Sequence, residues 1–325
     1  PSILIDILHE LFVARARPIL EKIMFYQSIK KIALMMALTM PFYAQSSYAQ
    51  INVFACEPEW ASLARALGGD TVKVTSATSA QQDPHHIQAR PSLIAKISRA
   101  DLLVCTGADL EVGWLPLLLR KSGNARIQPG QAGYFMAADY ISLLEKPTVL
   151  DRSLGDIHAA GNPHFHLDPS RIAQIAGALT DTLAKVDSAN TLHYQNKLAV
   201  FNEQWQQAIK LWKQRSQSLR GKRVVVSHSS WVYLETWLGL IQVATLEPKP
   251  GIPASSTHLS GVLKKLQQQP ADMLLHASYQ SNKSAVWLSN KSSLPIVTLA
   301  LSPSEDESLI IWFENIVSQL LSAKR

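Results

Sequence analysis

Histidines stand at three separated places where the sequence predicts the end of a strand or a loop. His85 lies in an Asp-Pro-His-His loop, His164 follows Pro163 where a long polar stretch ends, and His228 comes directly after Val-Val-Val-Ser. Neutral imidazole suits zinc, copper, iron and nickel, whereas magnesium and calcium prefer oxygen ligands. If the fold brings these side chains together, they would bind a transition metal. Zinc is the leading candidate, because nitrogen ligands hold it in tetrahedral geometry.

The elements that must position these histidines alternate between short β-branched runs and longer helical ones. This alternation predicts parallel sheets with helices on their faces, where ligands lie at the carboxyl ends of the strands. Residues 123–160 are rich in Gly, Pro and polar side chains, which predicts a long loop with one or two short elements. Strands are expected at 51–55, 71–74, 101–105, 223–226, 242–246, 273–275 and 295–299.

A long helix is expected between the two alternating halves. Its apolar side chains recur at three- and four-residue steps from Leu198 to Trp212, which predicts one helix over about residues 189–218. Such a helix would tie two α/β lobes together, with the metal site in the cleft between them. We therefore expect an N-terminal lobe at 50–188, a linking helix at 189–219 and a C-terminal lobe at 220–325.

The first 49 residues predict an extension followed by a signal peptide. Lys30 and Lys31 precede an apolar run and a small-residue stretch that ends at Ala49, so cleavage is expected near Ala49 and the protein is expected in the periplasm. The apolar run is shorter than the roughly 20 residues of a membrane-spanning helix. Met24 is the expected natural start, which makes residues 1–23 an extension.

The formal charge of +6 is spread along the chain without a basic block, which argues against nucleic acid as a partner. The chain holds two cysteines, and an exported protein with two cysteines permits one disulfide. Cys56 and Cys105 each end an apolar run, so adjacent parallel strands would bring them together. Two buried free thiols remain an equal alternative, because sequence does not supply the Cα separation that a bridge requires.

Taken together, the motifs resemble the solute-binding proteins of zinc and manganese ABC importers. Asp83-Pro84-His85, Pro163-His164 with Asp168-Pro169, and Val226-Ser227-His228 occur in the order of that family, with the long helix between the last two. The resemblance covers about residues 51–322. It implies that His85, His164 and His228 bind the metal, that the partner is an ABC permease in the inner membrane, and that nothing is catalysed. A monomer is the default expectation.

The fourth ligand departs from the family pattern. The family usually supplies a carboxylate just after the strand expected at 273–275, whereas this chain has His276 there. We take His276 as the first candidate and keep His158, Glu57 and water as alternatives. A site made of nitrogen ligands favours Zn²⁺ over Mn²⁺, which usually prefers a share of carboxylate oxygen. His86 and His166, which flank two of the ligands, are expected to be exposed neighbours.

Two other functions compete with metal transport. A zinc hydrolase also uses three histidines with an open position, but the sequence has no His-Glu-x-x-His and no Gly-x-Ser-x-Gly motif. An exported metal-binding adhesin or chaperone on the same scaffold stays open. Asp168 is expected to be structural, because Asp168-Pro169 is typical of a helix cap followed by the first helical turn.

Overall fold

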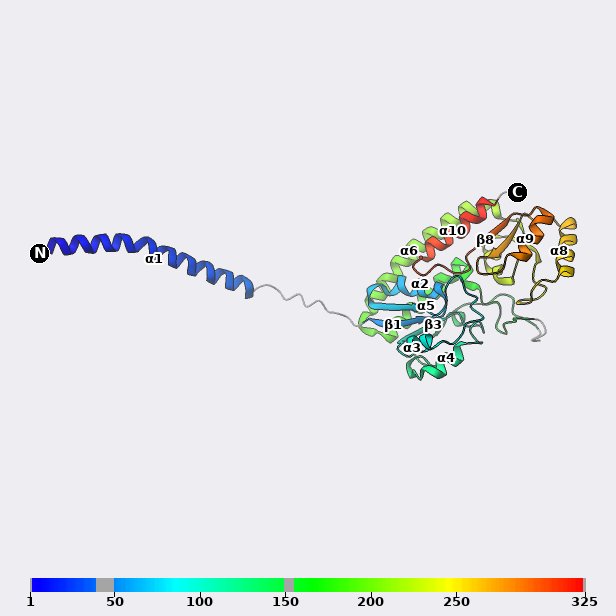
Figure 1. Ribbon diagram of the computed structural model, residues 1–325, viewed down its shortest axis with the longest axis horizontal. Coiled ribbons are helices and arrows are strands. Elements are labelled where there is room, and N and C mark those ends of the chain that lie inside the picture. The colour runs from blue at the N-terminus through cyan, green and yellow to red at the C-terminus, as the bar shows by residue number, and fades with distance from the viewer. Residues whose placement is uncertain (1, 39–49, 149–154, 324–325) are drawn as a thin grey trace. The chain divides into compact units, whose positions relative to one another are not determined.

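The computed structural model describes residues 2–38, 50–148 and 155–323 (Figure 1). The chain forms two compact units, Pro1–Tyr48 and Ala49–Arg325, and each is described by itself. In the first unit, α1 (Ser2–Leu38) is one helix that contains Pro18. Among the described residues, no helix is both long and apolar enough to cross a membrane. The cleavage position predicted near Ala49 lies outside the described residues.

The second unit begins with a parallel sheet in the order β2-β1-β3-β4. The central strands are buried and apolar, as expected where helices cover both faces of a sheet. Three of its helices carry Pro in the first turn, where the fixed φ of proline favours helix initiation. The elements are β1 (Ile51–Ala55), α2 (Pro58–Gly68), β2 (Val72–Ser76), α3 (Pro91–Ile97), β3 (Leu102–Cys105), α4 (Leu115–Ser122) and β4 (Tyr134–Met136).

Strand β4 lies inside the stretch that the sequence predicts as a long loop. It has only three residues and pairs with β3 through Leu103 and Tyr134. A strand this short shows no periodicity of its own, so only its pairing with β3 defines it. The remainder of the predicted loop that the structure describes contains short 3-10 turns, among them Ala125–Ile127 and Ala137–Tyr140.

A second parallel sheet repeats the same topology in the order β6-β5-β7-β8. Its strand β7 extends two residues beyond the predicted end, so His276 lies within the strand and pairs with Thr298 of β8. The elements are β5 (Arg223–Val226), α7 (Val232–Leu238), β6 (Ile241–Thr245), α8 (Ser256–Gln268), β7 (Met273–Ala277), α9 (Lys283–Ser292), β8 (Ile296–Leu299) and α10 (Leu309–Ser322).

The predicted long helix is confirmed as α6 (Thr191–Arg215), which follows α5 (Pro169–Val186) and packs beside α10 (Figure 1). Trp205 of α6 donates a hydrogen bond to the Pro169 carbonyl and packs against Phe313 of α10. One apolar core therefore runs from the first sheet through α6 to the second sheet. The two-lobed α/β fold is confirmed, whereas the boundaries 50–188, 189–219 and 220–325 stay a prediction.

Candidate metal centre

Three imidazole rings that are far apart in the sequence converge between the two lobes. The ring centroids of His85 and His164 lie 5.6 Å apart, those of His164 and His228 6.0 Å, and those of His85 and His228 6.2 Å. A fourth ring, that of His158, lies 5.3 Å from His85. The structure therefore brings together the three histidines that the sequence predicts as ligands, and adds one of the alternatives for the fourth position.

Each lobe positions its histidines through loops at the carboxyl ends of its strands. His85 follows β2, and its loop is fastened where Trp114 Nε1 donates to the carbonyl of Pro84, 2.9 Å away. The His164 N–H donates to Asn162 Oδ1 at 3.0 Å, and Asn162 Nδ2 donates to the carbonyl of Ser229 at 2.9 Å. Because Ser229 is the residue after His228, one asparagine side chain holds the His164 and His228 segments of both lobes.

Carboxylates lie behind two of the rings. Asp83 Oδ1 accepts from Nδ1 of His85 at 2.8 Å, and Glu247 Oε2 accepts from Nδ1 of His228 at 2.7 Å. Glu247 also accepts from the Gly251 N–H at 2.9 Å, which holds its carboxylate in place. A carboxylate on Nδ1 leaves the Nε2 lone pair for a metal and raises its basicity. Both rings are therefore oriented to coordinate through Nε2.

Burial keeps the imidazoles of His164 and His158 neutral. His164 is 2% exposed, and burial followed by the charge of His85 holds the pKa of His164 well below its ordinary value. Burial also lowers the pKa of His158 to about 4, with His85 as the next cause. Nδ1 of His164 and Nδ1 of His158 are buried without a hydrogen-bond partner. Neutral rings are suited to a metal, because each has one nitrogen without a proton and only such a nitrogen coordinates.

A cavity of about 550 Å³ opens beside these rings. Residues of both lobes line it, including Asp83, His85, His228, Glu247 and Tyr279. Within the described parts of the chain, no three histidines have ligand nitrogens that all lie within 4.8 Å of one another. Binding an ion would therefore draw the rings inward and, since they belong to both lobes, would link the lobes.

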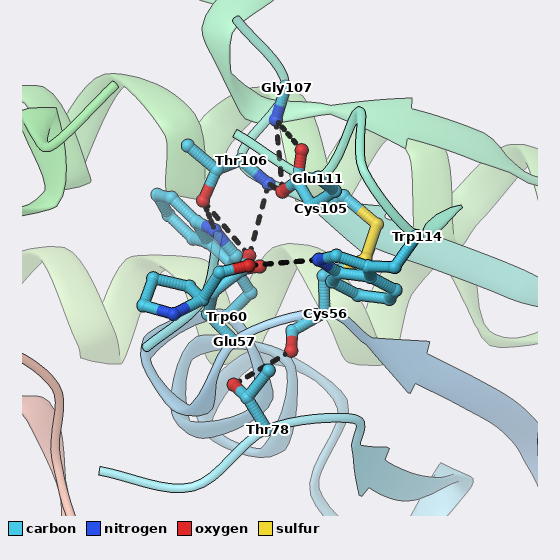
Figure 2. Close-up of a disulfide and its surroundings, with 10 residues drawn as sticks. Cys56, Glu57, Trp60, Thr78, Cys105, Thr106, Gly107, Glu111 and Trp114 are labelled. Atoms are coloured by element: carbon cyan, nitrogen blue, oxygen red, sulfur yellow. Dashed lines mark hydrogen bonds between the residues drawn. A yellow bond between two sulfur atoms is a disulfide. The ribbon is translucent and has the colours of Figure 1, made fainter. Parts of the chain in front are cut away.

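A different trio does meet that distance, namely Cys56, Cys105 and Glu111. Cys56 and Cys105 form a disulfide with a Cα separation of 4.8 Å, so neither sulfur is a free thiolate ligand (Figure 2). This decides between the two alternatives that the sequence leaves open. Glu57 Oε2 accepts from Thr106 Oγ1 at 2.9 Å, which engages that carboxylate in the same buried network.

The remaining candidates lie apart from the three converging rings. His276 is 2% exposed, its Nδ1 is 3.1 Å from Ser227 Oγ, and the ring contacts of the described residues do not join it to His85, His164 or His228. His86 is exposed, as expected.

The expectation that His166 is exposed is wrong. Its ring is buried, Nε2 lies 3.1 Å from the Leu301 carbonyl, and the ring stacks on Trp312. The residue faces the core because a 3-10 turn over Phe165–Leu167 directs it inward.

Sequence reasoning missed Glu247. It lies 19 residues from His228, and no local motif links the two. A signal was present, because each residue follows the end of one of two neighbouring strands, β5 and β6, and parallel strands end at the same edge of a sheet.

Residues 53–323 match the family model described as zinc-uptake complex component A, periplasmic (ZnuA). The manganese ABC transporter substrate-binding lipoprotein PsaA of Streptococcus pneumoniae is 23% identical over 260 residues, which cover 78% of this chain and 80% of PsaA. The zinc-binding lipoprotein AdcA of Streptococcus pneumoniae (strain ATCC BAA-255 / R6) is 23% identical over 242 residues, which cover 74% of this chain and 47% of AdcA. This chain thus spans about half the length of AdcA.

Solved structures share the fold. A crystal structure of ZnuA aligns with a TM-score of 0.71 at 21% identity, covering 85% of this chain and 100% of that one. The structure of FpvC from Pseudomonas aeruginosa in complex with Mn²⁺ aligns with a TM-score of 0.71 at 18% identity, covering 84% of this chain and 97% of FpvC. At these identities the likeness supports the two-lobed architecture alone.

Proposed function

We propose, from the premise that this chain belongs to the family of periplasmic zinc-uptake components, that it captures one transition-metal ion between its lobes and delivers it to an ABC permease in the inner membrane. The observation that carries the proposal is the convergence of His85, His164 and His228 from both lobes. An ion held by side chains of two lobes would link the lobes, and a docked permease could recognise the linked form.

The chemistry of the ligands favours Zn²⁺ over Mn²⁺. The three converging groups are imidazoles, and the nearby carboxylates of Asp83 and Glu247 are engaged with the Nδ1 atoms of two rings. Oxygen ligands are therefore not directed at the metal position, whereas Mn²⁺ usually prefers a share of them. The named relatives include both manganese and zinc proteins, so metal preference rests on the site.

The same arrangement argues against a hydrolase. A zinc hydrolase needs an open coordination position beside a free general base. Here Asp83 and Glu247 each hold an imidazole in place, so neither carboxylate is free to take a proton from a metal-bound water. The named relatives are substrate-binding components of transporters. We therefore assign capture and release of the ion, and no catalysis.

The test is a titration of the purified protein with Zn²⁺ and Mn²⁺, read as affinity against a competing chelator. The wild type should bind one tight equivalent of Zn²⁺ and bind Mn²⁺ more weakly. His85→Ala, His164→Ala and His228→Ala should each lose more than about 100-fold in zinc affinity, because an imidazole ligand disappears.

The matched control is His193→Ala, which removes an imidazole that contacts the Gly68 carbonyl instead of the site. It should bind zinc as the wild type does. If zinc binding is weak in the wild type, or indifferent to the three site variants, the proposed function is wrong.

A further inference from the structure

We propose that His158 supplies the fourth nitrogen ligand of the metal, from the loop that precedes His164, because its Nε2 lies 3.3 Å from Nε2 of His85. This inference rests on the proposed function and specifies its site. It selects His158 over His276 for the position that the sequence leaves open.

The distance between the two rings fits a shared metal. Nε2 of His85 and Nε2 of His158 lie 3.3 Å apart. Two nitrogens bound at 2.0–2.1 Å to one tetrahedral zinc ion are about 3.3–3.4 Å apart. The two atoms therefore already have the separation that coordination requires. The other rings would move toward this pair as the ion binds.

His85 and His158 can both coordinate the metal as neutral rings, so neither ring has to gain or lose a proton. Asp83 accepts the Nδ1–H of His85, which leaves the His85 Nε2 lone pair facing His158. Without metal, an Nε2–H on His158 can donate to that lone pair. When the ion binds, His158 takes the other neutral tautomer, with its proton on the buried and unpartnered Nδ1.

The protein offers a carbonyl for that relocated proton. The backbone of Ala108 lies near enough to the His158 ring to raise its pKa against the lowering by burial, and the buried Nδ1 has no hydrogen-bond partner. Metal-bound imidazoles usually donate their second N–H to a carbonyl or carboxylate. His158 would thus gain the kind of support that His85 has from Asp83 and His228 has from Glu247.

The turn that presents this carbonyl is held firmly. Gly107, Ala108 and Asp109 have φ values of 76°, 51° and 65°, a left-handed conformation that costs free energy in residues other than glycine. The Glu111 carboxylate accepts from the N–H groups of Thr106 at 2.7 Å and Gly107 at 3.0 Å (Figure 2). The network beside the disulfide therefore fixes the turn that contains Ala108.

The loop that carries His158 is fastened to the second lobe and closed by a hydrogen bond of its own. The Asp156 N–H donates to the carbonyl of Pro250 in the second lobe at 3.0 Å, and the Gly161 N–H donates to the carbonyl of His158 at 3.1 Å. A Cβ added to Gly251 would lie 2.2 Å from Asp156 Oδ2, so the two segments are in close contact. A ligand on this loop is thus positioned by the second lobe while its ring meets His85 of the first.

His276 is placed for a different role. It lies inside β7, and its Nδ1 is 3.1 Å from Ser227 Oγ. Among the described residues its ring makes no contact with those of His85, His164 and His228, so coordinating the metal would require the side chain to move toward them. His158 requires only a change of tautomer.

The experiment counts imidazole ligands by X-ray absorption at the zinc edge and measures zinc affinity, in the wild type, His158→Ala, His158→Gln and His276→Ala. The wild type should show four imidazoles. Both His158 variants should show three and lose about 10- to 100-fold in affinity, of the size that a weakened site shows. His276→Ala should keep four imidazoles and change affinity less than about 3-fold.

Other outcomes would overturn the assignment. These are three imidazoles in the wild type, four in the His158 variants, or a ligand lost from His276→Ala. His164→Ala, measured in parallel, separates this failure from failure of the proposed function. If zinc binding survives in His164→Ala as well, the whole site is wrong, whereas loss of binding there with unchanged His158 variants rejects only the fourth ligand.

Discussion

The two lobes have the same sheet topology and register but carry different residues at equivalent positions. Cys56 follows β1 and faces Cys105 of β3, and Ser227 follows β5 and faces His276 of β7, with the same register in both sheets. The first pair is a disulfide and the second is a hydrogen-bonded contact of 3.1 Å. At equivalent positions, the central strands of one lobe are joined covalently and those of the other by a polar contact.

The correspondence extends to the neighbouring strand. The Thr78 N–H donates to the Cys56 carbonyl at 3.2 Å, and the Glu247 N–H donates to the Ser227 carbonyl, also at 3.2 Å. Thr78 Oγ1 donates to the same Cys56 carbonyl, whereas the Glu247 carboxylate holds the imidazole of His228. The shared sheet topology sets the positions of these side chains. The residue type at each position decides whether it stabilises a lobe or supports the proposed metal site.

The largest effect should come from breaking the covalent pair. Cys56→Ala with Cys105→Ala opens a loop with a sequence separation of 49, and chain entropy then predicts a loss of about 4 kcal/mol in the free energy of unfolding. Urea unfolding of the double variant beside the wild type measures it. A loss below about 1 kcal/mol would mean that the bridge adds no more than the polar contact of the second lobe.

The next effect concerns the carboxylate that only the second lobe has at this position. Glu247→Ala removes the acceptor of the His228 Nδ1–H and should weaken zinc binding about 10- to 100-fold, because the ring loses its orientation and basicity. Thr78→Ala is the matched control at the equivalent place in the first lobe, and its zinc affinity should equal that of the wild type. Equal losses in both variants would show that the effect is structural.

Two buried groups, one in each lobe, should make stability depend on pH in opposite directions. Burial raises the pKa of Glu111 in the first lobe to about 7, so its contribution is present below the unfolded pKa near 4.5 and is lost as pH rises through 7. Burial lowers the pKa of His276 in the second lobe, so stability is lost as pH falls below 6.5. As pH rises from 5 to 8, the free energy of unfolding of Glu111→Gln should therefore increase by about 1–2 kcal/mol relative to that of the wild type.

Thermal or urea unfolding of Glu111→Gln and the wild type at several pH values tests this. The amide of glutamine still offers an oxygen to the Thr106 and Gly107 N–H groups, which makes it the conservative replacement. Parallel pH profiles for the two proteins would contradict the assignment of the slope to Glu111.

The smallest effect should come from the polar pair itself. Ser227→Ala removes one hydrogen-bonding partner of His276 and should lower the free energy of unfolding by about 1 kcal/mol. Zinc affinity should change little if His276 serves the strands instead of the metal. If Ser227→Ala lost much zinc affinity with little change in the free energy of unfolding, His276 would be a metal ligand after all.

Much of the fold was predictable because local patterns carry it. The apolar face of α6 repeats along the helix, Asp168 caps α5 by accepting from the Ser170 N–H at 2.8 Å, and β5 occupies the predicted residues 223–226. Three of the converging histidines were also predictable, since the rule that ligands lie at the ends of parallel strands needs only the position of each strand.

Tertiary contacts decided the rest. Strand β4 exists through pairing with β3, the Cys56–Cys105 bridge depends on a Cα separation, and Glu247 reaches His228 across 19 residues. His276 and His158 are alike as residues, but one lies inside a paired strand and the other lies against His85. Sequence by itself determined which side chains could bind a metal, because that depends on residue type. Only the folded chain determined which of them meet, because distances between remote segments are set by packing.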